Sequence, residues 1–167
     1  KAVKSTMKVF HGLSLGLMPL RPSWVHECLR QGQWTTPSAA HRVPLTVGGS
    51  STRRGAATAD GATDKQLLAG YTIVPIGSDP WRVAWSALLR TSGAEVRTDL
   101  PPQHRAASGG GRTCLVLVEK DTDRARAAAP LERASSREVP SASQDWVKHC
   151  LLEQRILEPR RFPPTTK

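Results

Sequence analysis

The sequence has few aromatic residues, few cysteines and no long apolar run. Aromatic residues make up 5% of the 167 positions and hydrophobic residues 38%, and 5 of the aromatic residues are Trp. This supply of large apolar side chains is thin for a single core of this length, and it favours small domains anchored by Trp. No apolar run approaches the roughly 18 residues that cross a bilayer, and no secretory leader is visible. The sequence therefore predicts a protein without a membrane partner.

The three cysteines are Cys28, Cys114 and Cys150, an odd number in apolar surroundings. Such residues are typical of reduced, buried thiols in an intracellular protein rather than of a disulfide framework. We therefore expect no structural disulfide.

Negative charge is also scarce. The chain has 14 Asp and Glu against 24 Lys and Arg, which gives a net charge of +10. This excess favours anionic partners, including nucleic acid, acidic protein surfaces and phosphorylated segments. Charge alone does not choose among them.

Motifs for catalysis and metal binding are absent from the sequence. His26 with Cys28, and His149 with Cys150, lack the spacing of a zinc site. A glycine run at residues 109–111 precedes an apolar stretch, whereas a nucleotide-binding loop follows a strand and opens a helix. The sequence therefore predicts no enzyme activity, no metal and no cofactor.

An internal repeat organises the chain. The pattern Trp-Val-x-x-Cys-Leu occurs at residues 24–29 and at residues 146–151, which are 122 residues apart. Ser23 and Ser143 precede the two copies as candidate helix caps. This spacing favours duplication of a whole domain, and the alternative is chance similarity between two amphipathic helices.

Between the copies, residues 35–64 are rich in Gly, Ala, Ser, Thr and Pro, which indicates a linker. The linker carries Arg53 and Arg54, a charge pair that is solvated or contacts nucleic acid. We therefore expect three parts: the C-terminal half of a first repeat (1–34), an inter-repeat linker (35–64) and a second repeat (65–167).

The sequence of the second repeat (65–167) predicts alternating strands and helices. We expect strands at 71–76, 94–97, 113–118 and near Val139, and helices from Asp79 to about Gly93, over 121–129 and around Trp146. The first part shows only the end of this order, with a helix over 1–15, a strand at 17–20 and the Trp24 helix. The fold class expected is α/β, with a small parallel sheet between helices.

This order, with Trp near the start of the last helix, resembles the BRCT repeat. Residues 5–12 (Ser-Thr-Met-Lys-Val-Phe-His-Gly) resemble the Thr-x-Lys motif and the following Gly of a first repeat, and residues 65–70 resemble the entry to a second. The resemblance implies tandem BRCT repeats, each a small parallel four-stranded sheet flanked by helices, with the first repeat truncated at its N-terminus. The tandem form resembles that of the breast-cancer susceptibility protein and its RING-domain partner, with checkpoint mediators second.

The resemblance implies a phosphate site in the first repeat. Lys8 matches the lysine that contacts phosphoserine in the family, and Thr6 matches the residue that helps to position it. Ser5 stands where the best-known member has an Arg that fixes the peptide backbone. The alternative for Lys8 is a solvated helix lysine.

The resemblance also implies a second pocket between the repeats, for a peptide side chain beyond the phosphoserine. Phe10 matches a residue that lines this pocket, and a plain core role is its alternative. Asp79 and Trp81, at the start of a second-repeat helix, are expected at the rim. Residues 121–124 lack Thr-x-Lys, so no second phosphate site is expected.

The function expected is a phosphoserine-peptide-binding module of a nuclear DNA-damage-response scaffold, with phosphorylated nuclear proteins as partners. Two alternatives remain: binding of nucleic acid, chromatin or poly(ADP-ribose) through positive charge, and a dimerisation module of a repair enzyme. Any enzyme activity, such as that of a ubiquitin ligase, would lie outside this chain.

Overall fold

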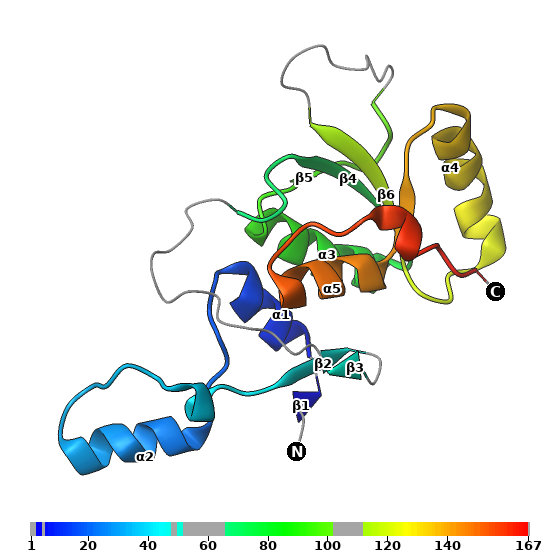
Figure 1. The fold of residues 1–167 in the computed structure, drawn as a ribbon. Coiled ribbons are helices and arrows are strands. Elements are labelled where there is room, and N and C mark those ends of the chain that lie inside the picture. The colour runs from blue at the N-terminus through cyan, green and yellow to red at the C-terminus, as the bar shows by residue number, and fades with distance from the viewer. Residues whose placement is uncertain (1–2, 5, 48–49, 52–65, 102–111, 167) are drawn as a thin grey trace.

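The computed structural model describes residues 3–4, 6–47, 50–51, 66–101 and 112–166. Its strands form a three-stranded sheet, ordered β1-β2-β3, and a four-stranded sheet, ordered β5-β4-β6-β7. Figure 1 shows the larger sheet surrounded by helices, with the elements of the first part of the chain beside it. No helix of the described residues is long and apolar enough to span a membrane.

The four-stranded sheet is parallel throughout. Its strands are β4 (Tyr71–Ile76), β5 (Glu95–Val96), β6 (Thr113–Val118) and β7 (Ser141–Ser143). The two long central strands pair residue by residue, from Tyr71 opposite Thr113 to Ile76 opposite Val118. Burial on both faces explains why residues 113–118 are continuously apolar. The predicted bounds of these two strands are confirmed.

Alternate residues of β4 and β6 face two separate apolar clusters. Ile73, Leu115 and Leu117 pack with α3 (Asp79–Thr91) and α5 (Gln144–Glu153). Val74 and Val116 pack on the other face with α4 (Arg124–Ser136). Helices therefore cover both faces of the sheet, as the α/β prediction requires (Figure 1).

Helix α4 is longer than predicted, since it continues past Pro130 to Ser136. A proline inside a helix removes a backbone hydrogen bond and normally ends the helix. Here the turns beyond Pro130 bury Ala134 and pack Leu131 against the sheet. Burial of these apolar side chains offsets the cost of the proline.

Helix α1 (Met7–Ser14) joins the core of the second part. Phe10 and Leu13 are 2% and 3% exposed and belong to the same cluster as Leu88 of α3 and Trp146 of α5. The Gln154 side-chain amide also donates to the Leu13 carbonyl, at 3.4 Å. The first and second parts of the chain are therefore packed together through α1, α3 and α5.

The N-terminal segment differs from its prediction. The helix expected over 1–15 begins only at Met7, and β1 (Val3–Lys4) instead pairs in parallel with β2 (Leu45–Val47). The prediction extended the helix because Val3, Met7 and Phe10 share a helical period. The pairing of β1 is with a distant segment, so local periodicity gave no sign of it.

Two further segments also differ. The expected strand at residues 17–20 reduces to a single antiparallel bridge between Leu20 and Arg42. The stretch expected as linker contains a 3-10 helix (Ala39–His41), β2 and β3 (Ser50–Ser51). Residues 48–49 and 52–64, which include Arg53 and Arg54, lie outside the described residues.

The internal repeat is visible in the backbone. Helix α2 (Pro22–Gln31) and α5 each have 10 residues, and their bounds differ by the same 122 positions as the Trp motif. Left-handed residues follow both helices, Gly32 (φ 67°) and Gln154 (φ 49°). Because α2 starts at Pro22, Ser23 lies inside the helix and is not its cap, whereas Ser143 does precede α5.

The repeat extends upstream of these helices. Helices α1 and α4 end at Ser14 and Ser136, again 122 residues apart, and each is followed by a residue of positive φ, Gly16 or Glu138. The closing hydrogen bonds also match. The Leu17 N–H donates to the Gly12 carbonyl at 2.8 Å, and the Val139 N–H donates to the Ala134 carbonyl at 2.9 Å. Chance similarity of two helices does not account for matched helix ends at two places.

Side-chain contacts repeat as well. The indole N–H of Trp24 donates to the carbonyl 11 residues later, as does that of Trp146, at 2.9 and 2.8 Å. Cys28 and Cys150 each contact the residue 7 positions later, through Thr35 Oγ1 and the Leu157 N–H respectively. These contacts extend the repeat to the loop after each helix.

Candidate functional site

Thr6 and Lys8 lie at the start of α1. Thr6 is the N-cap residue, with extended backbone angles (φ −91°, ψ 165°), and its hydroxyl makes no capping hydrogen bond. Both side chains are exposed. Ser5 lies outside the described residues. The two phosphate-site candidates are therefore together at a helix N-terminus, and the first turn holds no acidic residue.

The electrostatics of this helix end suit an anion. The first N–H groups of a helix have no partner within it, and the helix dipole places partial positive charge there. The Lys8 ammonium adds a full positive charge at the second helical position. A phosphate at this end would accept backbone hydrogen bonds and a charge-assisted hydrogen bond from lysine.

Phe10 lies one turn further along α1. It is 2% exposed and sits in the apolar cluster shared with α3 and α5. This position is that of a core side chain, which was the alternative for this residue. Its role in lining a pocket stays a prediction.

Asp79 and Trp81 lie in the first turn of α3. Asp79 is largely exposed and accepts from Arg82 at 2.6 Å, and this hydrogen bond lowers the pKa of the carboxyl group. The half-buried Trp81 ring stacks on Trp85, with centroids 5.4 Å apart, and its indole N–H donates to Gln144 Oε1 at 2.6 Å. Trp81 therefore links the start of α3 to the start of α5.

The structure brings the predicted elements together only in part. Helix α1 packs on α3, so the first-repeat and second-repeat candidates lie on neighbouring helices. Among the described residues, no hydrogen bond, ion pair or ring contact joins Thr6 or Lys8 to Asp79 or Trp81. The exposed N-terminus of α1 thus lies beside the junction of α1 and α3. The expected role of Asp79 and Trp81 at the rim of a pocket stays a prediction.

A carboxylate that was not predicted from the sequence lies at the N-terminus of α3. Glu119 follows β6, and it accepts from the Ser78 N–H at 2.6 Å and from the Ser78 hydroxyl at 3.2 Å. Arg126 donates to the neighbouring Gly77 carbonyl at 3.2 Å. The only sequence signal was the Gly-Ser pair before Asp79. A carboxylate of the chain itself therefore lies at this helix end.

Gly77 makes this contact possible, so Gly77→Ala is expected to destabilise the fold by about 1–3 kcal/mol through overpacking. An added Cβ would lie 2.6 Å from Glu119 Oε2 and 2.8 Å from Trp81 Cε3. Urea unfolding measures the loss. Gly70→Ala is the matched control, because nothing lies within 4 Å of its Cβ position. Equal stability of the two variants would contradict the close packing at Gly77.

Groups of three or more His, Cys, Asp or Glu side chains arranged to hold a metal are absent from the described residues.

Comparisons with known proteins bear on the fold. No family model matches the chain, and no curated protein matches it. Among solved structures, the BRCT5-BRCT6 domains of S. pombe Brc1 are similar, with a TM-score of 0.55 and 12% identity over 93% of this chain and 76% of that one. S. pombe Rad4 BRCT3,4 has a TM-score of 0.47 and 13% identity, over 87% of this chain and 68% of that one. With the parallel sheet between helices and the internal repeat, the similarity to Brc1 shows that the chain has the α/β fold of tandem BRCT domains.

Proposed function

We propose that the chain is a protein-interaction module that binds phosphoserine peptides, within a nuclear DNA-damage-response or repair protein, and that it is not itself an enzyme. The observation that carries the proposal is the pair Thr6 and Lys8, both exposed at the N-terminus of α1 in a tandem BRCT fold. The net charge of +10 favours such an anionic partner.

In the proposed complex, the phosphate lies at the N-terminus of α1. The helix dipole and the free N–H groups of the first turn bind the phosphate oxygens, and Lys8 supplies the charge-assisted hydrogen bond. The Thr6 hydroxyl, which has no capping bond, is a further donor. The peptide continues toward α3, where Asp79 and Trp81 form the rim of a pocket. The resemblance to the breast-cancer susceptibility protein and its RING-domain partner remains part of this proposal.

The test is binding of a fluorescent degenerate phosphoserine peptide library and its unphosphorylated counterpart to the full-length protein, followed by fluorescence anisotropy. Lys8→Met is expected to weaken binding of the phosphorylated library by about 10- to 100-fold, because a hydrogen bond to a charged group contributes about 1.5–3 kcal/mol. Lys120→Met removes the same charge from an exposed site in the second repeat, and it is expected to leave binding unchanged.

Equal binding of both libraries, or no binding, would overturn the proposal. The net positive charge favours nucleic acid or poly(ADP-ribose) as a second candidate. Affinity for a mixed-sequence oligonucleotide that falls steeply with salt and ignores Lys8→Met would support that candidate. A dimer with no affinity for either ligand would point to the dimerisation module.

A further inference from the structure

The sheet face under α4 has a hollow that the described side chains leave unfilled. Its floor is apolar and consists of Val74 and Ile76 of β4 and Val116 of β6. Residues 98–100, which follow β5, form one wall, and the C-terminal half of α4 with its C-cap forms the other. We call this space, of about 100 Å³, the α4 hollow.

Small residues on α4 explain why the hollow is there. The buried residues of α4 are Ala127 and Ala134, and Pro130 between them lines the hollow. On the opposite face of the sheet, by contrast, α3 and α5 bury large side chains such as Leu88 and Trp146. The space between helix and sheet is therefore left open by the sequence of α4 itself.

The size and floor of the α4 hollow suit one branched aliphatic side chain. An apolar cavity of roughly 150 Å³ accepts a benzene ring, so this smaller hollow suits the four side-chain carbons of leucine. Removal of such a side chain from water against the apolar floor is favourable. An ionised group placed there would lose its hydration without gaining a partner, so the charged part of a ligand stays at the mouth.

Two arginines lie at the mouth of the hollow. Arg133 and Arg137 are one helical turn apart, and both are exposed. Arg137 Nη1 donates to the Pro101 carbonyl at 2.9 Å, which holds this side chain beside the hollow. Asp99 on the other wall offsets one of the two positive charges, so the residues that line the hollow have a net charge of +1.

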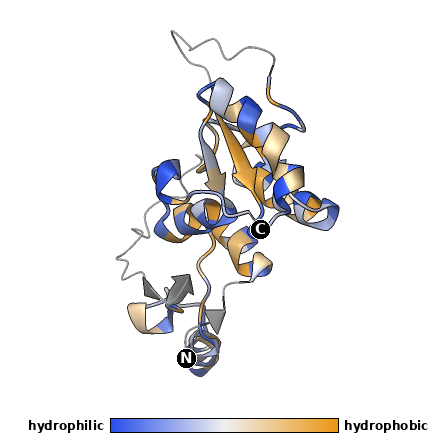
Figure 2. Cartoon of the chain, turned by 90° about the vertical axis from the view of Figure 1, so that its right-hand side faces the viewer, coloured by the Kyte–Doolittle hydropathy of each residue, from blue (hydrophilic) through white to orange (hydrophobic). Residues whose placement is uncertain are grey.

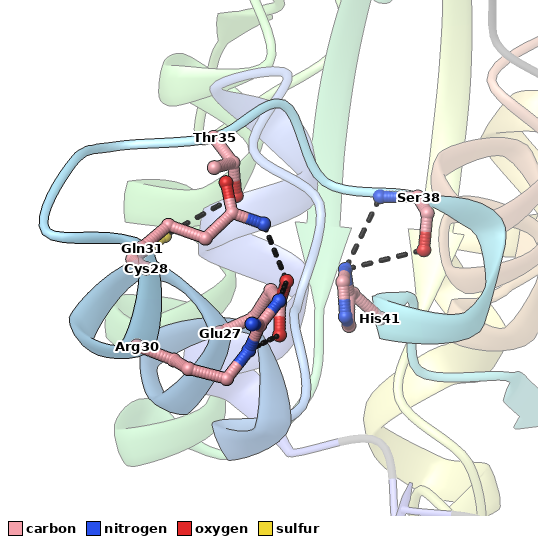
Figure 3. A network of polar contacts seen from close by, with 7 residues as sticks. All are labelled: Glu27, Cys28, Arg30, Gln31, Thr35, Ser38 and His41. Carbon is pink, nitrogen blue, oxygen red and sulfur yellow. Dashed lines mark hydrogen bonds and ion pairs between the residues drawn. The ribbon is translucent and has the colours of Figure 1, made fainter.

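Arg133 has no carboxylate partner among the described residues. Several other exposed arginines do have one. Arg30 donates two hydrogen bonds to Glu27, at 2.6 and 3.0 Å (Figure 3), and Arg97 pairs with Glu95 at 2.6 Å. The Arg133 guanidinium is therefore free to bind a carboxylate of another molecule, with which it can form two parallel hydrogen bonds.

We propose that the α4 hollow binds a short segment of a partner protein in which an aliphatic residue stands next to an acidic one. The aliphatic side chain fills the hollow, and the carboxylate accepts from Arg133, with the remaining N–H groups of Arg137 beside it. The acidic segment is complementary to the positive charge at the mouth. This site is separate from the proposed phosphoserine site, because Phe10 of α1 packs on the opposite face of the sheet.

Titration of the ¹⁵N-labelled 167-residue chain with acetyl-Asp-Leu-Asp-amide, followed by NMR, tests the proposal. The amide signals of residues that line the hollow, such as Leu100, Val116 and Arg133, are expected to shift most. Acetyl-Asn-Leu-Asn-amide has the same shape without the charge, and acetyl-Asp-Gly-Asp-amide has the same charge without the aliphatic side chain. Each is expected to bind about 10-fold more weakly or less, because it lacks one of the two contacts.

Variants at exposed positions locate the site. Arg133→Met is expected to reduce the affinity for the Asp-Leu-Asp peptide to that of its Asn twin. Arg124→Met is the matched control, since Arg124 is exposed at the start of the same helix and does not line the hollow. Lys8→Met is also expected to leave the affinity unchanged, so this test and that of the phosphoserine site fail independently. No binding, equal binding of the three peptides, largest shifts outside the hollow, or unchanged affinity in Arg133→Met would overturn the proposal.

Discussion

Trp146→Ala is expected to lower the free energy of unfolding by about 3–5 kcal/mol, the cost typical of removing a buried Trp. Trp146 is 0% exposed, its ring lies 5.5 Å from that of Tyr71, and its indole N–H donates to the Leu157 carbonyl. The substitution opens a cavity under α5 and leaves that carbonyl without its partner. Urea unfolding, followed by circular dichroism, measures the change.

The internal repeat provides a matched control in Trp24→Ala. Trp24 makes the corresponding hydrogen bond, to the Thr35 carbonyl, but it is only half-buried and its helix has an open face. We expect a loss of about 1 kcal/mol, the centre of the range for single substitutions. Equal losses from the two variants would contradict the difference in packing between α2 and α5.

Cys150 is expected to resist thiol reagents strongly in the folded protein. Burial raises the pKa of its thiol from 9.0 to about 11, so the thiolate fraction at ~pH 8 falls by about 100-fold, and the residue is 0% exposed. Timed alkylation with identification of the labelled cysteine by mass spectrometry measures this resistance. Rapid labelling of Cys150 without unfolding would contradict its burial.

The same shift predicts a pH dependence of stability. The folded state holds the Cys150 proton more tightly than the unfolded state does, so its contribution is complete below about pH 9 and is lost as the pH rises toward 11. Burial raises the pKa of Cys114 as well, which acts in the same direction. A Cys150→Ser variant is expected to lose part of this alkaline dependence in urea unfolding at a series of pH values.

The sequence predicted the second repeat well because its elements are specified locally. Residues 71–76 and 113–118 are apolar on both faces, and the Asp79-Pro80 pair opens a helix that a glycine of positive φ, Gly93, follows. The C-terminal end of helix α4 was predicted too early, because its continuation past Pro130 depends on packing against the sheet. The pairing of β1 with β2 joins segments distant in the chain, and no local pattern reports such a contact.

In the candidate site too, local features could be predicted from the sequence and contacts between distant segments could not. Thr6 and Lys8 are exposed at the start of α1, a helix that was expected to begin earlier, and their phosphate-binding role stays a prediction. The carboxylate of Glu119 at Ser78 was not predicted, because the two residues are 41 positions apart and meet only where the neighbouring strands β4 and β6 end. The buried position of Phe10 depends on helices that follow it by many residues.

Helix α1 precedes the first copy of the Trp motif in the sequence, but its buried side chains pack in the core of the second repeat. A fragment cut at the predicted boundary, residues 65–167, would retain α3 and α5 but lose Phe10 and Leu13, which pack between them. The apolar surface left open would favour aggregation of such a fragment. Figure 2 shows the hydrophobic colouring concentrated where these helices meet the sheet. The smallest unit for biophysical work on the second repeat therefore includes α1.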